Sequence, residues 1–206
     1  ISDNLLEDSF EGIRIWNDRN DINQISITNN NFAFNSKSIN VNSYDTNNNT
    51  IILISNNNIR KSRDYGIGIY LSQENDSKID IYDNLMEKID NNGVNIYSRG
   101  GQLSTNIYAN EIGASNEGIY IEARAGYYSD NMIYIASKIE SKIYKNVFNG
   151  ITENENNIGI KLRSVEYNNL QSTINSEIND NIFDDNINYE IVKDGEIINI
   201  TGNQAP

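Results

Sequence analysis

An asparagine recurs along this chain at nearly constant intervals, inside the same short pattern of apolar or small residues. In the copy Ile52-Ile54-Asn57-Ile59, alternating isoleucines precede the asparagine and another apolar residue follows it two positions later. The asparagines of the eight copies are Asn4, Asn30, Asn57, Asn84, Asn110, Asn146, Asn181 and Asn203. They are spaced by 26 or 27 residues over the first five, and then by 36, 35 and 22. A period of this length with alternating apolar residues predicts a solenoid of stacked β-strands.

A second element recurs between the asparagines, and it consists of a glycine followed by an apolar, a variable and another apolar residue. Its copies begin at Gly12, Gly66, Gly93, Gly118 and Gly159, with a serine variant at Ser38. Glycine here suits a corner in which φ is positive or the backbone is crowded. The 36 isoleucines favour strands because they are β-branched. Each turn is therefore predicted to hold three short strands, with the asparagine between the second and the third.

The corner asparagine has two physical explanations. Asparagine tolerates the left-handed backbone conformation that a tight corner requires. Asparagine amides on successive turns can also hydrogen-bond to one another as a ladder. We therefore predict that all eight asparagines are structural residues aligned along one edge of the solenoid.

The asparagine pattern and the Gly-led strands together resemble the right-handed parallel β-helix of the pectin-lyase-like superfamily, which is built from parallel β-helix repeats. In that family the turn after the asparagine-containing pair of strands is tight and filled by asparagine. The resemblance covers essentially the whole chain and implies one all-β domain, residues 1–206, of about eight turns with three short strands each. None of the family's enzyme signatures is intact here. Because the chain begins inside a repeat and shows no capping helix, we expect it to be an excerpt of a longer one.

The composition excludes several kinds of chemistry. The net charge of −13 argues against nucleic acid and anionic membranes as partners, because both require a basic patch. Without cysteine or histidine the chain lacks disulfides, the commonest general base and the commonest transition-metal ligand. We expect no cofactor and no metal. Calcium is an open alternative, since the acidic, Asn-rich loops offer oxygen ligands but match no defined loop motif.

The outward positions of the Gly-led strands form the candidate binding surface, because side chains alternate across a strand. The predicted carbohydrate-binding residues on this stripe and just beyond it are Arg14, Trp16, Asn42, Tyr70, Asn95, Tyr97, Tyr120, Glu122, Arg124, Lys161 and Arg163. Asn40 and Gly68 fill the remaining positions. Aromatic rings can pack on the apolar faces of sugars while amides and charges bond their hydroxyls. The competing interpretation is a plain solvated face, because tyrosine is common in strands.

An enzymatic interpretation uses four of the same residues. Glu122 and Arg163 are expected in register on adjacent turns, as are Tyr120 and Lys161. A cation could neutralise a uronate while tyrosine or lysine acts as the base of a β-elimination. The alternative is a simple cross-strand ion pair.

Two further features of the sequence, its clustered acids and one insertion, bear on a possible active site. Glycoside hydrolysis needs a pair of carboxylates across a cleft. The candidate acids are the adjacent Asp184 and Asp185 and the loose group Asp76, Asp80 and Asp83, and neither set has a distinctive pattern. The insertion from Arg124 to Asp130 is either a wall of the site or a tyrosine-packed loop.

These observations support three functions. The first is a non-catalytic rod, extracellular or on a cell or virion surface, that binds a polysaccharide along the aromatic and polar stripe. The second is a fragment of a polysaccharide lyase or hydrolase. The third is a purely structural repeat of a filament, sheath or phage tail fibre. Exposed strand edges at the two ends of a solenoid favour end-to-end or other homo-oligomeric association.

Overall fold

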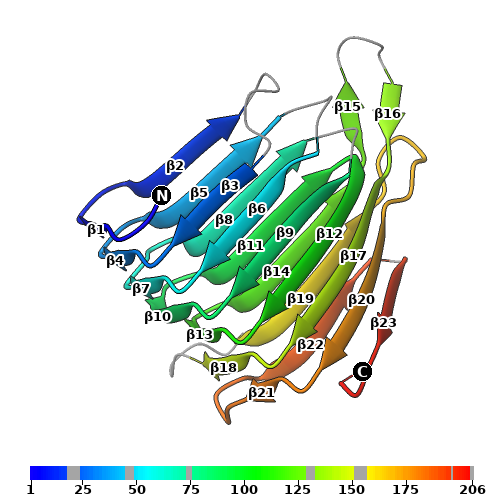
Figure 1. The fold of residues 1–206 in the computed structure, drawn as a ribbon. Coiled ribbons are helices and arrows are strands. Elements are labelled where there is room, and N and C mark those ends of the chain that lie inside the picture. Colours follow the sequence, from blue (N-terminus) through cyan, green and yellow to red (C-terminus); the bar gives the residue numbers. More distant parts are fainter. Residues whose placement is uncertain are drawn as a thin grey trace.

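The protein folds as a parallel β-helix with three sides (Figure 1). The computed structural model describes residues 1–17, 24–44, 49–72, 76–128, 133–150, 157–195 and 197–204. Within these residues the strands form three parallel seven-stranded sheets and one antiparallel hairpin. No helix in the described ranges is long and apolar enough to cross a membrane.

Each turn contributes one strand to each of the three sheets, which we name by their sequence features. The short sheet contains β1 (Leu5–Glu7), β4 (Asn31–Ala33), β7 (Asn58–Arg60), β10 (Leu85–Ile89), β13 (Glu111–Ala114), β18 (Val147–Gly150) and β21 (Ile182–Phe183). The glycine sheet contains β2 (Glu11–Asn17), β5 (Lys37–Ser43), β8 (Tyr65–Ser72), β11 (Asn92–Arg99), β14 (Glu117–Arg124), β19 (Ile158–Val165) and β22 (Tyr189–Asp194). The isoleucine sheet contains β3 (Gln24–Thr28), β6 (Ile51–Ser55), β9 (Ser77–Tyr82), β12 (Gly101–Tyr108), β17 (Ser137–Tyr144), β20 (Thr173–Asn179) and β23 (Ile198–Thr201).

The seven strands of each sheet correspond to seven turns, where the repeat count suggested about eight. The difference arises because eight corner asparagines delimit only seven intervals. The core runs along the inside of the stack as columns of like residues. On β6 and β9, for example, Ile52 pairs in register with Ile79 and Ile54 pairs with Ile81, and all four side chains are fully buried.

The asparagine ladder is present and nearly continuous. From Asn4 to Asn146, each Nδ2 donates to the Oδ1 of the next corner asparagine at 2.9–3.1 Å, and Asn181 is the last acceptor. Each of these Oδ1 atoms also accepts the backbone N–H of the preceding asparagine. Asn203 does not extend this column: it is exposed, and Gln204 Oε1 accepts the N–H of Asn181 at 2.8 Å instead. The backbone of this last corner also differs, because Gly202 has a φ of 116°, whereas the residues before the other corner asparagines have φ of 53–59°.

The left-handed residue at each corner is the one before the ladder asparagine. The residues with positive φ are Asp3, Asn29, Asn56, Asp83, Ala109, Lys145 and Asp180. The prediction that the recurring asparagine itself adopts this conformation is therefore wrong. The corner asparagine is suited to its position by its side-chain amide, which hydrogen-bonds to backbone groups on its own turn and on the neighbouring turns.

The recurring glycines owe their place to crowding. Gly118 has no positive φ, but a Cβ there would lie 2.5 Å from the Phe148 ring and 2.7 Å from the carbonyl oxygen of Gly159. Gly93 and Gly159 face Ile112 and Phe183 of the next turn in the same way. Of the two explanations offered by the sequence, backbone crowding is the correct one. Removing the side chain lets a large apolar residue of the short sheet fill the corner of the core.

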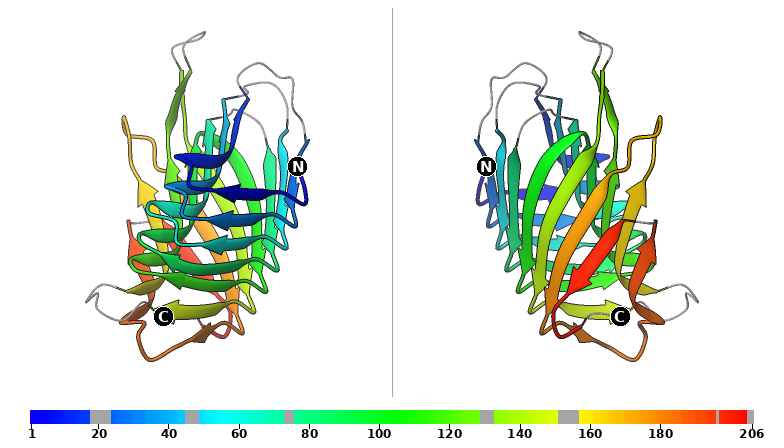
Figure 2. Two further views of the ribbon diagram at one scale, coloured as in Figure 1. Left: turned by 90° about the vertical axis from the view of Figure 1, so that its left-hand side faces the viewer. Right: turned by 90° about the vertical axis from the view of Figure 1, so that its right-hand side faces the viewer.

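The insertion after β14 forms a hairpin of β15 (Gly126–Tyr128) and β16 (Ile133–Ile135), which projects from the stack (Figures 1 and 2). Its tip, residues 129–132, lies outside the described residues. The later insertion has two parts: residues 151–156 of the first part are also outside the described residues, whereas the second part, residues 163–173, is described. The ring of Tyr134 contacts that of Tyr167, with centroids 5.4 Å apart. The two long insertions therefore meet on one side of the molecule.

Candidate functional site

The predicted stripe residues lie on one face of the glycine sheet and in register. One column consists of Trp16, Asn42, Tyr70, Tyr97, Glu122 and Arg163. The neighbouring column consists of Arg14, Asn40, Gly68, Asn95, Tyr120 and Lys161. The register pairs expected for Glu122 with Arg163 and for Tyr120 with Lys161 are thus correct.

Five aromatic rings form a continuous line across five successive turns of this face. We call Trp16, Tyr44, Tyr70, Tyr97 and Tyr120 the aromatic line. Consecutive ring centroids are 4.9, 5.3, 6.0 and 6.3 Å apart. Half of the surface of Trp16 is exposed, so the line opens to solvent at its N-terminal end.

Tyr44 was not expected in the line. It follows β5 directly and bridges the gap that Asn42 leaves between Trp16 and Tyr70. It stands two residues after the outward Asn42 and one residue beyond the end of β5, so it continues the outward alternation past the strand. This two-residue spacing, together with the aromatic residues on both adjacent turns, is the signal that could have identified it.

Polar side chains flank the N-terminal half of the aromatic line. The guanidinium of Arg14 lies 5.2 Å from the ring centroid of Trp16 and pairs with Glu11 at 3.4 Å. Asn42 Nδ2 donates to Asn40 Oδ1 at 3.0 Å. Further along, Arg99 Nη1 donates to the hydroxyl of Tyr70 at 2.9 Å. Donors and acceptors thus lie beside the apolar faces of the rings.

The C-terminal end of the line is a buried ion cluster around Glu122, which is fully buried although it points to the outer face. The Tyr120 hydroxyl donates to Glu122 Oε2 at 2.5 Å, and Arg163 Nη1 lies 3.5 Å from the same oxygen. Arg124 Nη2 lies 3.1 Å from Oε1, in an ion pair that lacks hydrogen-bond alignment. Glu122 was predicted to contact a ligand, but its neighbours separate it from solvent.

Lys161 belongs to the same end of the face. Its ammonium pairs with Glu117 at 3.2 Å and lies 5.7 Å from the ring centroid of Tyr120. The structure therefore brings together all four candidates for catalysis. It also engages each of them in internal contacts, so that Lys161, Arg163 and Tyr120 all have a carboxylate partner.

The environment of Tyr120 holds its phenol in the neutral form. Burial raises the pKa of Tyr120 well above its ordinary value, and the hydrogen bond to Glu122 raises it further. Burial and Glu122 also raise the pKa of Tyr97. A base must be deprotonated when it acts, so these shifts make Tyr120 a poor base near neutral pH.

These shifts predict late ionisation of two tyrosines. Burial also raises the pKa of Tyr65, with Asp64 adding to the effect, so Tyr65 and Tyr120 should ionise well above pH of about 10. Both tyrosines have a higher pKa in the folded state than in the unfolded state. Their neutral forms therefore contribute fully to stability below the unfolded-state pKa, and this contribution is lost as the pH rises through the folded-state pKa. Tyrosinate absorbance should show a phase at high pH, and Glu122→Gln should lower the pKa values of Tyr120 and Tyr97 but leave that of Tyr65 unchanged. A single phase at the ordinary pKa would contradict this assignment.

The candidate acids for hydrolysis make local contacts, with backbone N–H groups at Asp184 and with side chains at Asp80. Asp184 Oδ1 accepts the N–H groups of Gly150 and Asn186, both at 3.0 Å. Asp80 pairs with Lys78 at 2.8 Å on the isoleucine sheet, whereas Asp184 follows a strand of the short sheet. The two groups of acids are therefore not brought together. Among the described residues, no three acidic side chains are grouped to hold a metal ion.

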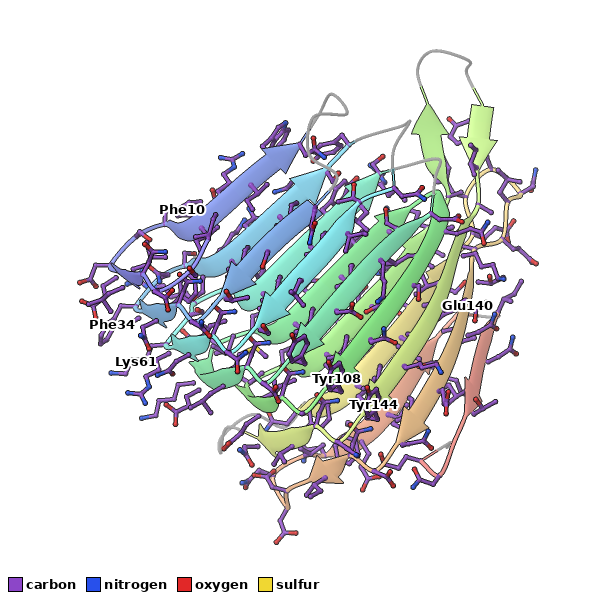
Figure 3. All side chains as sticks on the ribbon, viewed as in Figure 1. Phe10, Phe34, Lys61, Tyr108, Glu140 and Tyr144 are labelled. Carbon is purple, nitrogen blue, oxygen red and sulfur yellow. The ribbon has the colours of Figure 1, made fainter. Side chains whose placement is uncertain are left out.

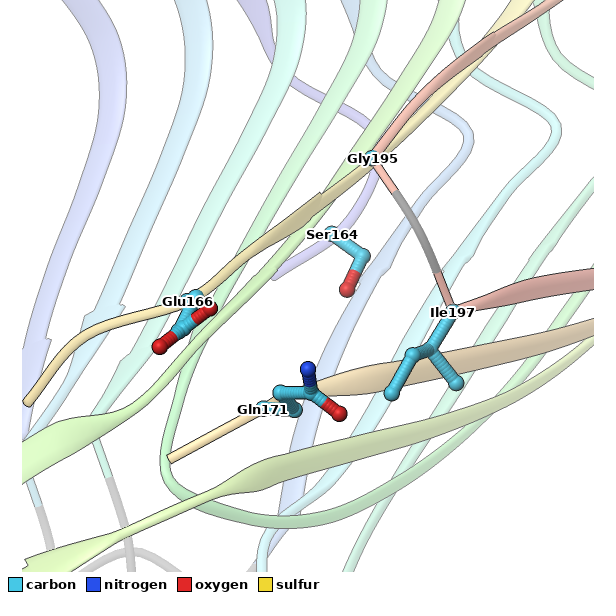
Figure 4. Close-up of a pocket in the computed structure, with 5 residues that line it drawn as sticks. All are labelled: Ser164, Glu166, Gln171, Gly195 and Ile197. Atoms are coloured by element: carbon cyan, nitrogen blue, oxygen red, sulfur yellow. The ribbon is translucent and has the colours of Figure 1, made fainter. Parts of the chain in front are cut away.

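A separate hollow of about 210 Å³ lies at the corner between the glycine and isoleucine sheets of the last turns (Figure 4). Its lining residues are Ser164, Glu166, Gln171, Gly195 and Ile197. It is smaller than ordinary ligand pockets, which start at about 300 Å³. None of its lining residues belongs to the aromatic line, so it is not part of this site.

No family model, no curated protein and no solved structure matches this chain.

Proposed function

We propose that the aromatic line is the binding surface for a polysaccharide and that the protein is a non-catalytic rod at an extracellular, cell or virion surface. The single observation that carries this proposal is the contact of five aromatic rings over five turns, open to solvent at Trp16. A sugar polymer has apolar ring faces at regular intervals, which suit such a row. The resemblance to pectin-lyase-like β-helices is compatible with a saccharide ligand.

The charges on this face favour a neutral glycan. Arg14 is paired with Glu11 and Lys161 with Glu117. Arg163 lies between Glu122 and Asp194, at 3.5 and 3.2 Å. A uronate would have to displace these carboxylates and approach a chain of net charge −13. Neutral hydroxyls can use the same groups without breaking the pairs.

The lyase interpretation is the weaker alternative for a specific reason. Elimination needs a base that is deprotonated and able to reach the sugar. Tyr120 is held neutral by burial and by Glu122, and the ammonium of Lys161 is paired with Glu117. Both groups would have to leave their partners before they could act.

Glycan arrays and titration with the best neutral oligosaccharide test this proposal. Trp16→Ala and Tyr97→Ala should each weaken binding by about tenfold or more, which corresponds to about 1.4 kcal/mol. Phe10→Ala is the matched control, because Phe10 is an exposed aromatic residue outside the aromatic line, and it should leave binding unchanged.

Three outcomes would contradict the proposal. Equal losses in all three variants would mean that the aromatic line is not the site. Release of unsaturated sugars that Lys161→Ala abolishes would establish the lyase. End-to-end polymers without any glycan signal would favour a structural repeat.

A further inference from the structure

A second group of aromatic rings lies on a different face, the outside of the isoleucine sheet. Tyr82, Tyr108 and Tyr144 are register partners on β9, β12 and β17. Their ring centroids are 4.9 and 5.0 Å apart and their planes differ by 9° and 6°, so the rings are stacked. Tyr108 and Tyr144 lie side by side near the ends of their strands (Figure 3).

The stack ends at the turn that follows Tyr144. There the register partner is Asn179, whose side chain is much smaller than a tyrosine ring. Tyr108 covers one face of the Tyr144 ring, and the opposite face points toward the turn of Asn179. Beside it lies a hollow of about 290 Å³ lined by Lys142, Tyr144, Glu177, Asn179 and Asp180. The hollow therefore occupies the place where a fourth ring of the stack would be.

This hollow continues into a second one along the sheet. The second has a volume of about 390 Å³ and shares Lys142 and Glu177 with the first. Its lining residues are Ser104, Asn106, Glu140, Ser141, Lys142, Asn175, Ser176, Glu177, Asn199 and Thr201. Every one of these residues carries a polar side chain. The volume of the first hollow is near the lower limit for ligand sites, about 300 Å³, so it suits a single ring. The adjoining second hollow leaves room for a neighbouring group.

The polar groups around the Tyr144 face indicate which ring fits. Lys142 lies 3.5 Å from Glu177, and the Asn179 amide donates to Glu177 at 3.0 Å. Asp180 accepts the Nδ2 of Asn203 at 2.7 Å. Each group keeps further hydrogen-bonding capacity, so that Lys142 and Asn179 can donate to a ligand while Glu177 and Asp180 can accept from it. An unsubstituted aromatic ring would desolvate these groups without bonding to them, which is unfavourable. A phosphate or uronate would meet two carboxylates against one ammonium. A neutral ring with hydroxyls around its edge satisfies both the aromatic face and the polar rim.

We propose that the free face of Tyr144 and this hollow form a second saccharide site, which takes one neutral pyranose ring stacked on Tyr144. Its hydroxyls bond to Lys142, Glu177 and Asn179. The site lies on the isoleucine sheet, whereas the aromatic line lies on the glycine sheet, so the two sites do not depend on each other. Burial between its two neighbours raises the pKa of Tyr108, which agrees with a ring covered on both faces and leaves the ends of the stack as the available ones.

The test uses the whole chain and a panel of methyl glucoside, methyl mannoside, methyl galactoside and N-acetyltyrosinamide, with binding measured by titration in NMR. At least one glycoside should bind and shift the Tyr144 ring protons. Asn179→Tyr should weaken it by about tenfold or more, because the new ring fills the hollow and continues the stack. Tyr144→Ala should weaken it by a similar factor.

Tyr82→Ala is the matched control. Tyr82 is the half-buried tyrosine at the other end of the same stack and does not line the hollow, so its removal should change affinity by less than about twofold. Failure of every glycoside to bind, or full binding to Asn179→Tyr, would overturn the proposal. Tighter binding of N-acetyltyrosinamide than of any sugar would overturn the assignment to a saccharide. Tyr97→Ala should leave this site intact, which separates it from the aromatic line.

Discussion

Replacing Asn110 by leucine is expected to lower the free energy of unfolding by about 3 kcal/mol or more, although leucine has a similar size. Asn110 Oδ1 accepts both the backbone N–H and the Nδ2 of Asn84 at 3.0 Å. Its own Nδ2 donates to the Ile81 carbonyl and to Asn146 Oδ1, also at 3.0 Å. The leucine would leave several of these buried groups without a partner, and each such group costs about 1–3 kcal/mol.

Urea denaturation followed by circular dichroism measures this effect, with Asn106→Leu as the control. Asn106 lies on β12, four residues before Asn110. It is half-buried and donates a hydrogen bond to Asp80 at the surface. Its replacement should cost less than about 1 kcal/mol. Similar costs for the two variants would mean that the ladder contributes no more than a surface amide. Because solenoids can unfold in parts, hydrogen exchange should place the loss in the turns around Asn110.

Replacing Glu122 by alanine is expected to lower the free energy of unfolding by about 3 kcal/mol. The carboxylate is fully buried, and it neutralises Arg124 and Arg163 while accepting the Tyr120 hydroxyl. Removing it brings two guanidinium groups together without their shared anion. Because these arginines retain some contact with solvent, the cost should stay at the lower end of the range for a broken buried pair.

Glu140→Ala provides the comparison for Glu122. Glu140 pairs with Lys138 at 3.0 Å, with the same two-residue spacing along a strand, but both side chains are about half exposed. An exposed pair is worth about 0–1 kcal/mol, so this variant should be nearly neutral. Thermal or urea unfolding at neutral pH distinguishes the two glutamates. Equal stability of both variants would show that the cluster around Glu122 is hydrated in solution.

The sequence contained enough information for the fold because its signals repeat. One apolar pattern around an asparagine is ambiguous, but repetition every 26 or 27 residues leaves few architectures other than a solenoid. The detail of the corner was not predictable in the same way. In two of the eight copies asparagine stands at both adjacent positions, Asn29-Asn30 and Asn56-Asn57, and the pattern does not show which has positive φ and which supplies the amide.

The sequence predicted which residues of the candidate site are neighbours in register, but it did not predict which of them are buried. Alternation along the Gly-led strands correctly placed Tyr70 and Tyr97 next to each other. The burial of Glu122 depends on Arg163, 41 residues later, and on the Tyr120 hydroxyl, which no local pattern describes. The stack on the isoleucine sheet also has a signal in the sequence. A tyrosine stands two residues before the corner asparagine in three consecutive repeats, at Tyr82, Tyr108 and Tyr144.

The two ends of the chain lie at opposite ends of the stack, and this has a mechanical consequence (Figure 1). Tension between the ends would act along the hydrogen bonds that join neighbouring turns, so the interfaces would open one after another instead of resisting together in shear. A released turn of 26 or 27 residues lengthens the chain by about 90 Å, and each of the two longer turns by about 120 Å. The rod would therefore yield in steps and absorb extension gradually.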